Sequence, residues 1–425
     1  MKLTHHRRSL VTVLICVAPM MSAIAAWAQP ALVGHEFRVN QSRESLQLTP
    51  VAAFGPADNC LIVWESDIKG ILGRFYASNG RPASAEITLV ADRQLPTIPG
   101  RGEVLLRKHP AVVFLPGGEF LLFWTEERDS LSIDQFYEER HILEQSVRGQ
   151  RFSAAGKPVE ASFAVSQRET GFQRRPHAVL TKSDVMVVWE GAEGWRTSTA
   201  VSGRVLTRRG QARSAAVRLD AGQGLHVRDV VLASNAEGEA LAVWEKTTPD
   251  GDFEVVARPL DRNGAVSGPE IVPYASSVGR QRRPAVVATR GGDFLVAWQS
   301  YRPGGTRYGI FGQLLSPAGV AVGAERQLAT GVGEDQIAPA LALLPSGDVI
   351  ATWLDWVGAT PIGVYAVVVD EAGVPLGAEV RVSEDKIYPQ YQNAVAASPR
   401  GTIIAAWESR LDRGRGIAAR RLQAP

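Results

Sequence analysis

The sequence of 425 residues predicts an all-β fold, a single seven-bladed β-propeller with four-stranded antiparallel blades. Three observations carry this prediction: a tryptophan recurs about every 54 to 65 residues, short apolar runs alternate with Gly-rich turns in each copy, and residues 33–40 resemble a fourth strand that the last copy lacks. The recurring tryptophans are Trp64, Trp124, Trp189, Trp244, Trp298, Trp353 and Trp407.

The copy at residues 281–329 shows the expected blade most clearly. Two apolar runs, residues 284–288 and 294–298, flank a Gly-Gly-Asp turn and predict the first two strands, while residues 308–315 and 323–328 predict the third and fourth. The N-terminal segment 33–40 should complete the last blade and leave no open edge where the ring closes. The other blade repeats are expected near residues 47–90, 107–166, 173–220, 226–273, 336–383 and 390–422.

The second strand of several copies is apolar throughout, which is typical of a strand buried on both faces. The repeated tryptophans are therefore expected to fill the space between blades. A role for them in stacking on a sugar or a cofactor is the alternative.

The residue after each tryptophan varies together with one position on the third strand. Glutamate goes with arginine four times, as expected for opposite charges that face each other on adjacent strands. The pattern predicts that these glutamates are structural partners of the arginines and not general acids. The pairs are Glu65 with Arg74, Glu190 with Arg204, Glu245 with Arg258, and Glu408 with Arg420.

Residues 1–28 predict a cleaved signal peptide. Basic residues at positions 2, 7 and 8 precede an apolar run, and Ala26-Trp27-Ala28 supplies small residues for a signal peptidase. A membrane anchor is the alternative, but Pro19 and Ser22 interrupt the short run. A periplasmic or secreted protein is expected, with general secretion and twin-arginine export both open. After cleavage we expect no transmembrane segment.

Removing the three cations of the signal leaves 43 basic and 44 acidic residues. An exported chain that is almost neutral is not expected to bind nucleic acid. The expected partners are a protein, or an anionic ligand such as an acidic glycan, and the expected state is a monomer.

One fixed position lies just before each predicted first strand and holds a long polar side chain. These side chains either ring one mouth of the central channel or cap backbone groups at a turn. The residues are Gln47, Arg107, Gln173, His226, Gln281, Gln336 and Gln390.

Basic residues gather unevenly beside this position, in blades two to five. They predict a funnel for a carboxylate, a phosphate or an acidic glycan, with ordinary solvated surface charge as the alternative. The candidate ligand-binding residues are Arg107, Lys108, His109, Arg174, Arg175, Arg228, Arg282 and Arg283.

Two segments exceed the regular repeat length. The insert Glu126–Ser146 allows a short amphipathic helix, and the extension Ala91–Arg107 precedes the same blade. Both are expected on the face of the basic mouth, which makes that face the candidate for ligand or partner binding.

Three motifs, Gly-Gly-Asp-Phe-Leu-Val-Ala-Trp at 291–298, Gly-Ile-Phe-Gly-Gln at 309–313 and Ala-Gly-Val-Ala-Val-Gly at 318–323, are similar to Trp-containing repeats of bacterial secreted propeller proteins. The resemblance covers nearly the whole chain after residue 28. It implies the fold and export, but no single activity.

We therefore expect a non-enzymatic binding or scaffolding propeller. The alternative is an enzyme, a hydrolase or lyase that acts on an acidic glycan or an anionic small substrate at the channel mouth. Its acid–base residues would be His226, Asp229, His109 and His177, which the fold could bring together. No metal site and no cofactor is expected.

Overall fold

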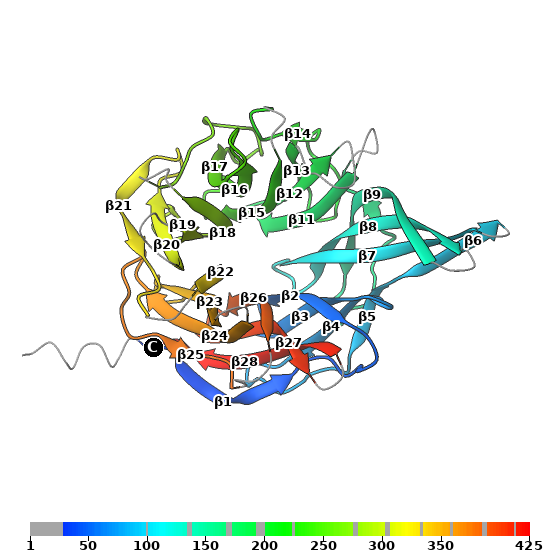
Figure 1. Ribbon diagram of the computed structural model, residues 1–425, viewed down its shortest axis with the longest axis horizontal. Coiled ribbons are helices and arrows are strands. Elements are labelled where there is room, and N and C mark those ends of the chain that lie inside the picture. The colour runs from blue at the N-terminus through cyan, green and yellow to red at the C-terminus, as the bar shows by residue number, and fades with distance from the viewer. Residues whose placement is uncertain are drawn as a thin grey trace, which may run out of the picture.

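The computed structural model describes residues 29–98, 101–133, 138–166, 172–192, 200–222, 226–274, 279–301, 307–331, 335–357, 360–384, 389–411 and 414–425. These residues are all-β and contain no helix, and their antiparallel sheets follow one another around a ring, as in a β-propeller (Figure 1). The predicted signal peptide, residues 1–28, lies outside the described residues. None of the described segments is a helix long and apolar enough to cross a bilayer.

The strands follow the apolar runs and end at Gly-containing turns. In chain order they are β1 Ala31–Arg38, β2 Gln47–Phe54, β3 Cys60–Ser66, β4 Gly70–Tyr76, β5 Ile87–Ala91, β6 Arg93–Ile98, β7 Arg101–Phe114, β8 Phe120–Ile133, β9 Glu138–Phe152, β10 Phe163–Ala164, β11 Phe172–Leu180, β12 Val185–Ala192, β13 Ala200–Leu206, β14 Val217–Arg218, β15 Val227–Ser234, β16 Ala240–Thr247, β17 Phe253–Leu260, β18 Arg280–Ala288, β19 Phe294–Tyr301, β20 Tyr308–Leu315, β21 Ala321–Gln327, β22 Asp335–Leu343, β23 Val349–Val357, β24 Thr360–Val369, β25 Val380–Arg381, β26 Gln390–Ala397, β27 Thr402–Leu411 and β28 Gly414–Gln423.

Within the described residues the strands form six hydrogen-bonded sheets. Four of them have the predicted four strands: β2 to β5, β18 to β21, β22 to β25, and β26 to β28 with β1. Strands β15 to β17 form a three-stranded sheet, and β6 to β14 form one sheet of nine strands. The nine-stranded sheet is continuous because one parallel bridge, Phe172 with Gln145, joins β11 to β9. The architecture is thus propeller-like, although the sequence predicted seven separate sheets.

We name each repeat unit after its inner strand, which is the strand nearest the ring axis. These strands each contribute residues to the wall of a central channel with a volume of about 470 Å³. The inner strands are β2, β7, β11, β15, β18, β22 and β26.

The N-terminal strand closes the ring as the sequence predicted. Strand β1 pairs with β28, the last strand of the chain, from Ala31 opposite Gln423 to Arg38 opposite Ala418. Just beyond β1, the Asn40 side-chain oxygen accepts the backbone N–H of Ile417 at 2.8 Å. The two ends of the chain therefore share one sheet.

Deleting residues 29–40 should lower the melting temperature, because it exposes the edge of β28 and removes the buried Asn40 contact. Differential scanning calorimetry would measure this, with a deletion of residues 29–30 alone as the matched control. If the longer deletion melted like the control, β1 would not close the ring.

The repeated tryptophans pack between sheets and are at most 1% exposed. Trp244, for example, shares a core cluster with Val188, Val201 and Leu219 of the preceding unit. Core filling is therefore confirmed for these seven side chains, and the sugar-stacking alternative is wrong for them, since no ligand can reach a buried ring.

The predicted pairing of glutamates with arginines is wrong. Glu245 lies opposite Val255, whereas Arg258 lies opposite Ala242. Ala242 and Glu245 are three positions apart on β16, and an odd offset along a strand places side chains on opposite faces. The arginines bond to the preceding unit instead, as when Arg204 Nη1 donates to the carbonyl oxygen of Val165 at 3.0 Å.

Candidate functional site

Each inner strand carries one non-glycine residue in the left-handed region, at the point where a β-bulge interrupts its pairing. A bulge turns the following side chains in a new direction, which is useful at the rim of a channel. Left-handed backbone costs of the order of 1 kcal/mol or more for such residues, so surrounding contacts must hold it. The residues, with φ between 27° and 54°, are Thr49, His109, Arg175, Asp229, Arg283, Ala338 and Gln392.

The residue after a repeat tryptophan provides that contact to the next unit. Its side-chain oxygen accepts the backbone N–H of the left-handed residue, which fixes the bulge and links the two units. Leu354 has no oxygen to offer, and its partner position Gln392 has the smallest φ of the set, 27°. The bonds are Glu65 to His109 (3.1 Å), Thr125 to Arg175 (2.9 Å), Glu190 to Asp229 (2.7 Å), Glu245 to Arg283 (2.8 Å), Gln299 to Ala338 (3.1 Å) and Glu408 to Thr49 (2.7 Å).

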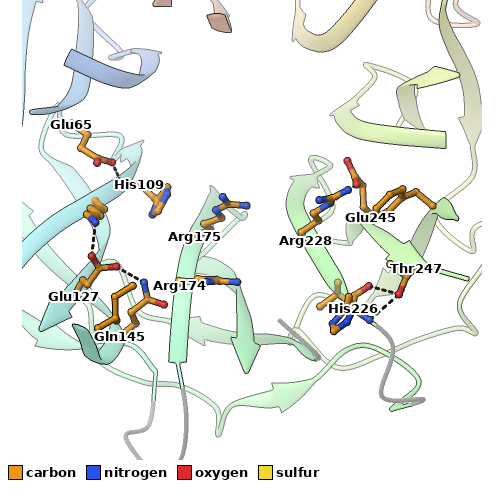
Figure 2. Close-up of a pocket in the computed structure, with 14 residues that line it drawn as sticks. Glu65, His109, Glu127, Gln145, Arg174, Arg175, His226, Arg228, Glu245 and Thr247 are labelled. Atoms are coloured by element: carbon orange, nitrogen blue, oxygen red, sulfur yellow. Dashed lines mark hydrogen bonds and ion pairs between the residues drawn. The ribbon is translucent and has the colours of Figure 1, made fainter. Parts of the chain in front are cut away.

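A pocket of about 790 Å³ opens beside the channel, between the β7, β11 and β15 units. Figure 2 shows His109 between Glu65 and Arg175, with His226 and Arg228 across the opening on the β15 side. The structure thus brings together six of the candidate residues named from the sequence: Lys108, His109, Arg174, Arg175, His226 and Arg228.

Buried carboxylates hold the arginines of this pocket, which we call the basic pocket. Glu190, whose side chain is 0% exposed, lies 3.4 Å from Arg174 Nε and 3.7 Å from Arg175 Nη1. Asp229 Oδ1 also lies 3.2 Å from Arg175 Nη1. The arginines of the pocket are therefore fixed before any ligand arrives, and fixed guanidinium groups favour an anion.

On the β15 side, Glu245 holds Arg228 Nε at 2.7 Å and Arg282 Nε at 3.5 Å. Both guanidinium groups also lie over the ring of Phe253, at 4.2 and 4.6 Å from its centroid. Cation–π contacts of this kind restrict the arginines further. Sequence reasoning missed Phe253, although its place at the start of a third strand, after a loop on the predicted face, was a usable signal.

His109 is a neutral imidazole in this pocket. Its Nδ1 is buried, and burial, together with the charges of Arg175, Lys108 and Arg174, lowers the pKa of His109 to about 3. Burial raises the pKa of the neighbouring Glu65 carboxyl to about 7, although the hydrogen bond from the backbone N–H of His109 acts to lower that pKa. The His109 imidazole is therefore uncharged at neutral pH and is a weak proton acceptor.

Several candidate residues lie elsewhere. Arg107 is 8% exposed and turns inward to Glu126, with 3.2 Å between Nη2 and Oε2. Asp229, Arg282 and Arg283 line the central channel and are not among the described residues that line the basic pocket.

His177 also lies outside the described lining of the basic pocket. Its Nδ1 is buried, and burial lowers the pKa of the imidazole to about 4. The sequence predicted the same acid–base role for His177 as for His109, but only His109 is among the described residues that line the basic pocket.

The polar ring expected from the glutamines is not formed. Gln47 and Gln173 each accept the indole N–H of a repeat tryptophan, Trp64 and Trp189, at 2.7 Å. The glutamines at 47, 281, 336 and 390 are at most 4% exposed. The side-chain amides of Gln47, Gln281 and Gln336 also donate to the backbone carbonyl oxygens of Ser45, Gly279 and Gly331, as the alternative of a capped turn predicted.

The insert and the extension form long strands, so the predicted helix is wrong. Strands β8 and β9 stay paired from Glu126 opposite Ser146 to Ile133 opposite Glu138, while β6 and β7 supply two further strands beside them. The neighbouring strand β7 explains why the insert is extended. Pairing with β7 satisfies the backbone N–H and C=O groups that would otherwise have bonded within a helix. Figure 1 shows these strands extending outward from the ring. Ile142 and Gln145 of the insert line the basic pocket, as expected for that face.

No protein-family profile and no curated protein matches the chain. Among solved structures, it is similar to a protein of unknown function from Dyadobacter fermentans (TM-score 0.53, 11% identity, 79% of this chain and 98% of the other). It is also similar to a polysaccharide lyase, the PL25 ulvan lyase bound to -[GlcA(1-4)Rha3S]- (TM-score 0.55, 9% identity, 91% and 95%). A third similar structure is the NanB sialidase from Streptococcus pneumoniae (TM-score 0.50, 8% identity, 82% and 70%). At these identities the likeness establishes the fold alone.

These comparisons overturn the first functional prediction, that of a non-enzymatic binding or scaffolding propeller. A lyase and a sialidase are among the propellers that share this fold. The alternative drawn from the sequence, an enzyme with its site at the channel mouth, fits them better.

Proposed function

We propose that this protein is an enzyme that acts on an acidic glycan or a related anionic substrate in the basic pocket. The observation that carries the proposal is the convergence of four cations and two histidines on one opening of about 790 Å³. The cations are Lys108, Arg174, Arg175 and Arg228, and the histidines are His109 and His226.

The cations suit a uronate. Bidentate contacts from guanidinium groups bind a carboxylate strongly, and they also stabilise the extra negative charge that builds up when the adjacent carbon loses its proton. In such an elimination, a base takes the proton from the carbon next to the carboxylate. A carbon–carbon double bond forms, and the glycosidic oxygen leaves with its electron pair and takes up a proton.

Elimination fits the pocket better than hydrolysis. Most glycoside hydrolases need two carboxyl groups that face the glycosidic bond. Among the described lining residues, Glu65 bonds the His109 N–H, Glu127 pairs with Lys108, and Glu245 holds two arginines. Of the two lining histidines, the exposed His226 is the candidate for proton transfer, because a pKa of about 3 makes the uncharged His109 too weak a base for that step.

The test is to incubate the purified protein with a panel of acidic polysaccharides: ulvan, polygalacturonate, alginate and chondroitin sulfate. Ulvan comes first, because the similar lyase is bound to -[GlcA(1-4)Rha3S]-. We expect new reducing ends that appear together with the ultraviolet absorbance of an unsaturated uronate. Reducing ends without that absorbance would indicate hydrolysis, and the absence of both from every polysaccharide would contradict the proposal.

We also propose that the ring has seven blades and that the protein is exported to the periplasm or beyond. Two observations support the blade count. Each of the seven inner strands carries a left-handed residue, and the nine-stranded sheet consists of two units that a single parallel bridge joins. The basic and apolar pattern of residues 1–28 supports export.

A further inference from the structure

A second pocket, of about 290 Å³, lies on the other side of His109. It is formed by the β22, β26 and β2 units, and it shares Glu65 and His109 with the basic pocket. A chain-like ligand that passes over His109 would therefore enter both pockets.

The composition of this second pocket differs from that of the basic pocket. Its lining combines two large aromatic side chains, Trp356 and Tyr391, with apolar and charged side chains: Leu48, Ile337, Leu354, Glu65, Arg283, Glu408 and Arg415. Aromatic side chains beside fixed polar groups are a usual design of a small-molecule site. The aromatic rings suit the C–H face of a sugar ring, and the polar side chains suit its hydroxyl groups.

Trp356 does not belong to the repeated tryptophans. It lies three residues after the buried Trp353, at an irregularity in the pairing of β23 between Asp355 and Trp356. Its indole Nε1 is buried and has no hydrogen-bond partner among the described residues. The same holds for the core residues Trp124, Trp244, Trp298 and Trp407, so what distinguishes Trp356 is its place in the lining of the second pocket.

Tyr391 is held in place from one side. The Arg415 guanidinium lies over its ring at 4.3 Å from the centroid, and Arg415 Nη1 is 3.5 Å from Glu408 Oε2. Glu408 in turn bonds the backbone of Thr49 in the next unit. The aromatic wall is therefore anchored to the same contacts that join neighbouring units.

We infer that the Trp356–Tyr391 pocket is a second subsite, which binds a less charged, hydroxyl-rich sugar ring of the same glycan whose uronate occupies the basic pocket. The substrate is then an oligosaccharide or polysaccharide that spans the mouth, and not a small free anion. This inference rests on the proposed function for the identity of the glycan.

The test uses direct binding, which does not depend on turnover. Oligosaccharides of two to eight sugars, prepared from each polysaccharide of the panel, are titrated into wild type, Trp356→Ala, Tyr391→Ala and Trp356→Phe by calorimetry. Tyr301→Ala is the matched control, an aromatic side chain 39% exposed that lies outside the described lining of both pockets. Circular dichroism and melting verify that each variant is folded.

We expect wild-type affinity to rise about tenfold or more between disaccharide and longer oligomers. Trp356→Ala and Tyr391→Ala should lose that gain and keep the disaccharide affinity, Trp356→Phe should keep part of it, and Tyr301→Ala all of it. Equal affinities for all lengths, or no loss in either alanine variant, would overturn the subsite and leave the enzyme proposal intact. Binding that depends on Trp356 without any turnover would overturn the enzyme proposal and support the subsite. Failure of every oligomer to bind would overturn both.

Discussion

His226→Ala should lower kcat on the acidic glycan about 10²- to 10⁴-fold and leave the melting temperature unchanged. His226 is exposed at the pocket, and its backbone, not its imidazole, makes the hydrogen bonds to Thr247. Removing the imidazole therefore removes proton transfer without disturbing a buried contact. Steady-state kinetics on the cleaved polysaccharide, together with calorimetric melting, would measure both effects.

The control for this variant is His35→Ala. His35 lies on β1, its side chain is 93% exposed, and its Nδ1 lies 3.2 Å from Glu384 Oε1. We expect kcat to stay at the wild-type value in this variant. A His226→Ala enzyme with the same kcat as His35→Ala would assign the proton transfer to another group.

Glu245→Ala should lower the free energy of unfolding by about 1–3 kcal/mol, the usual cost of leaving a buried hydrogen-bonding group without its partner. The side chain is fully buried, bonds the Arg283 N–H at 2.8 Å and holds Arg228 and Arg282. Alanine leaves two guanidinium groups and one backbone N–H without this partner. Urea unfolding followed by tryptophan fluorescence would measure the loss.

The chain itself supplies the matched variant. Gln299 occupies the equivalent position in the next unit, where its oxygen accepts the Ala338 N–H at 3.1 Å. Glu245→Gln should therefore keep the backbone contact and lose only the charge interactions, so its stability should lie between wild type and Glu245→Ala. If glutamine and alanine destabilised the protein equally, the link between units would not depend on this backbone contact.

The propeller-like fold was predictable because its signals are local. A tryptophan after an apolar run, a Gly-containing turn and a spare strand at the N-terminus each appear within a few residues. The cluster of Lys108, His109, Arg174 and Arg175 was also predictable, since each pair sits at the same point of its repeat. Because the repeats follow one another around the ring, equivalent positions of two successive repeats lie at equivalent places in neighbouring units.

The remaining features depended on register and on neighbours in space. Covariation of Glu245 with Arg258 marked two positions of one repeat, and it could not reveal the offset that places them on opposite faces. The insert took a strand conformation because β7 lay beside it, and the sequence of the insert alone allowed a helix. Trp356 and Tyr391 belong to different units, and only the closed ring brings them into one pocket.

The left-handed residues of the inner strands have a practical consequence for engineering. Among the described residues, side chains as different as threonine, arginine, aspartate and alanine occupy this one backbone conformation at Thr49, Arg175, Asp229 and Ala338. The conformation is held by a bond to the backbone N–H, which every residue except proline provides. A combinatorial library confined to these rim positions would therefore vary the chemistry around the mouth while the tryptophan core keeps its packing. Such a library is a direct way to redirect the specificity of this scaffold.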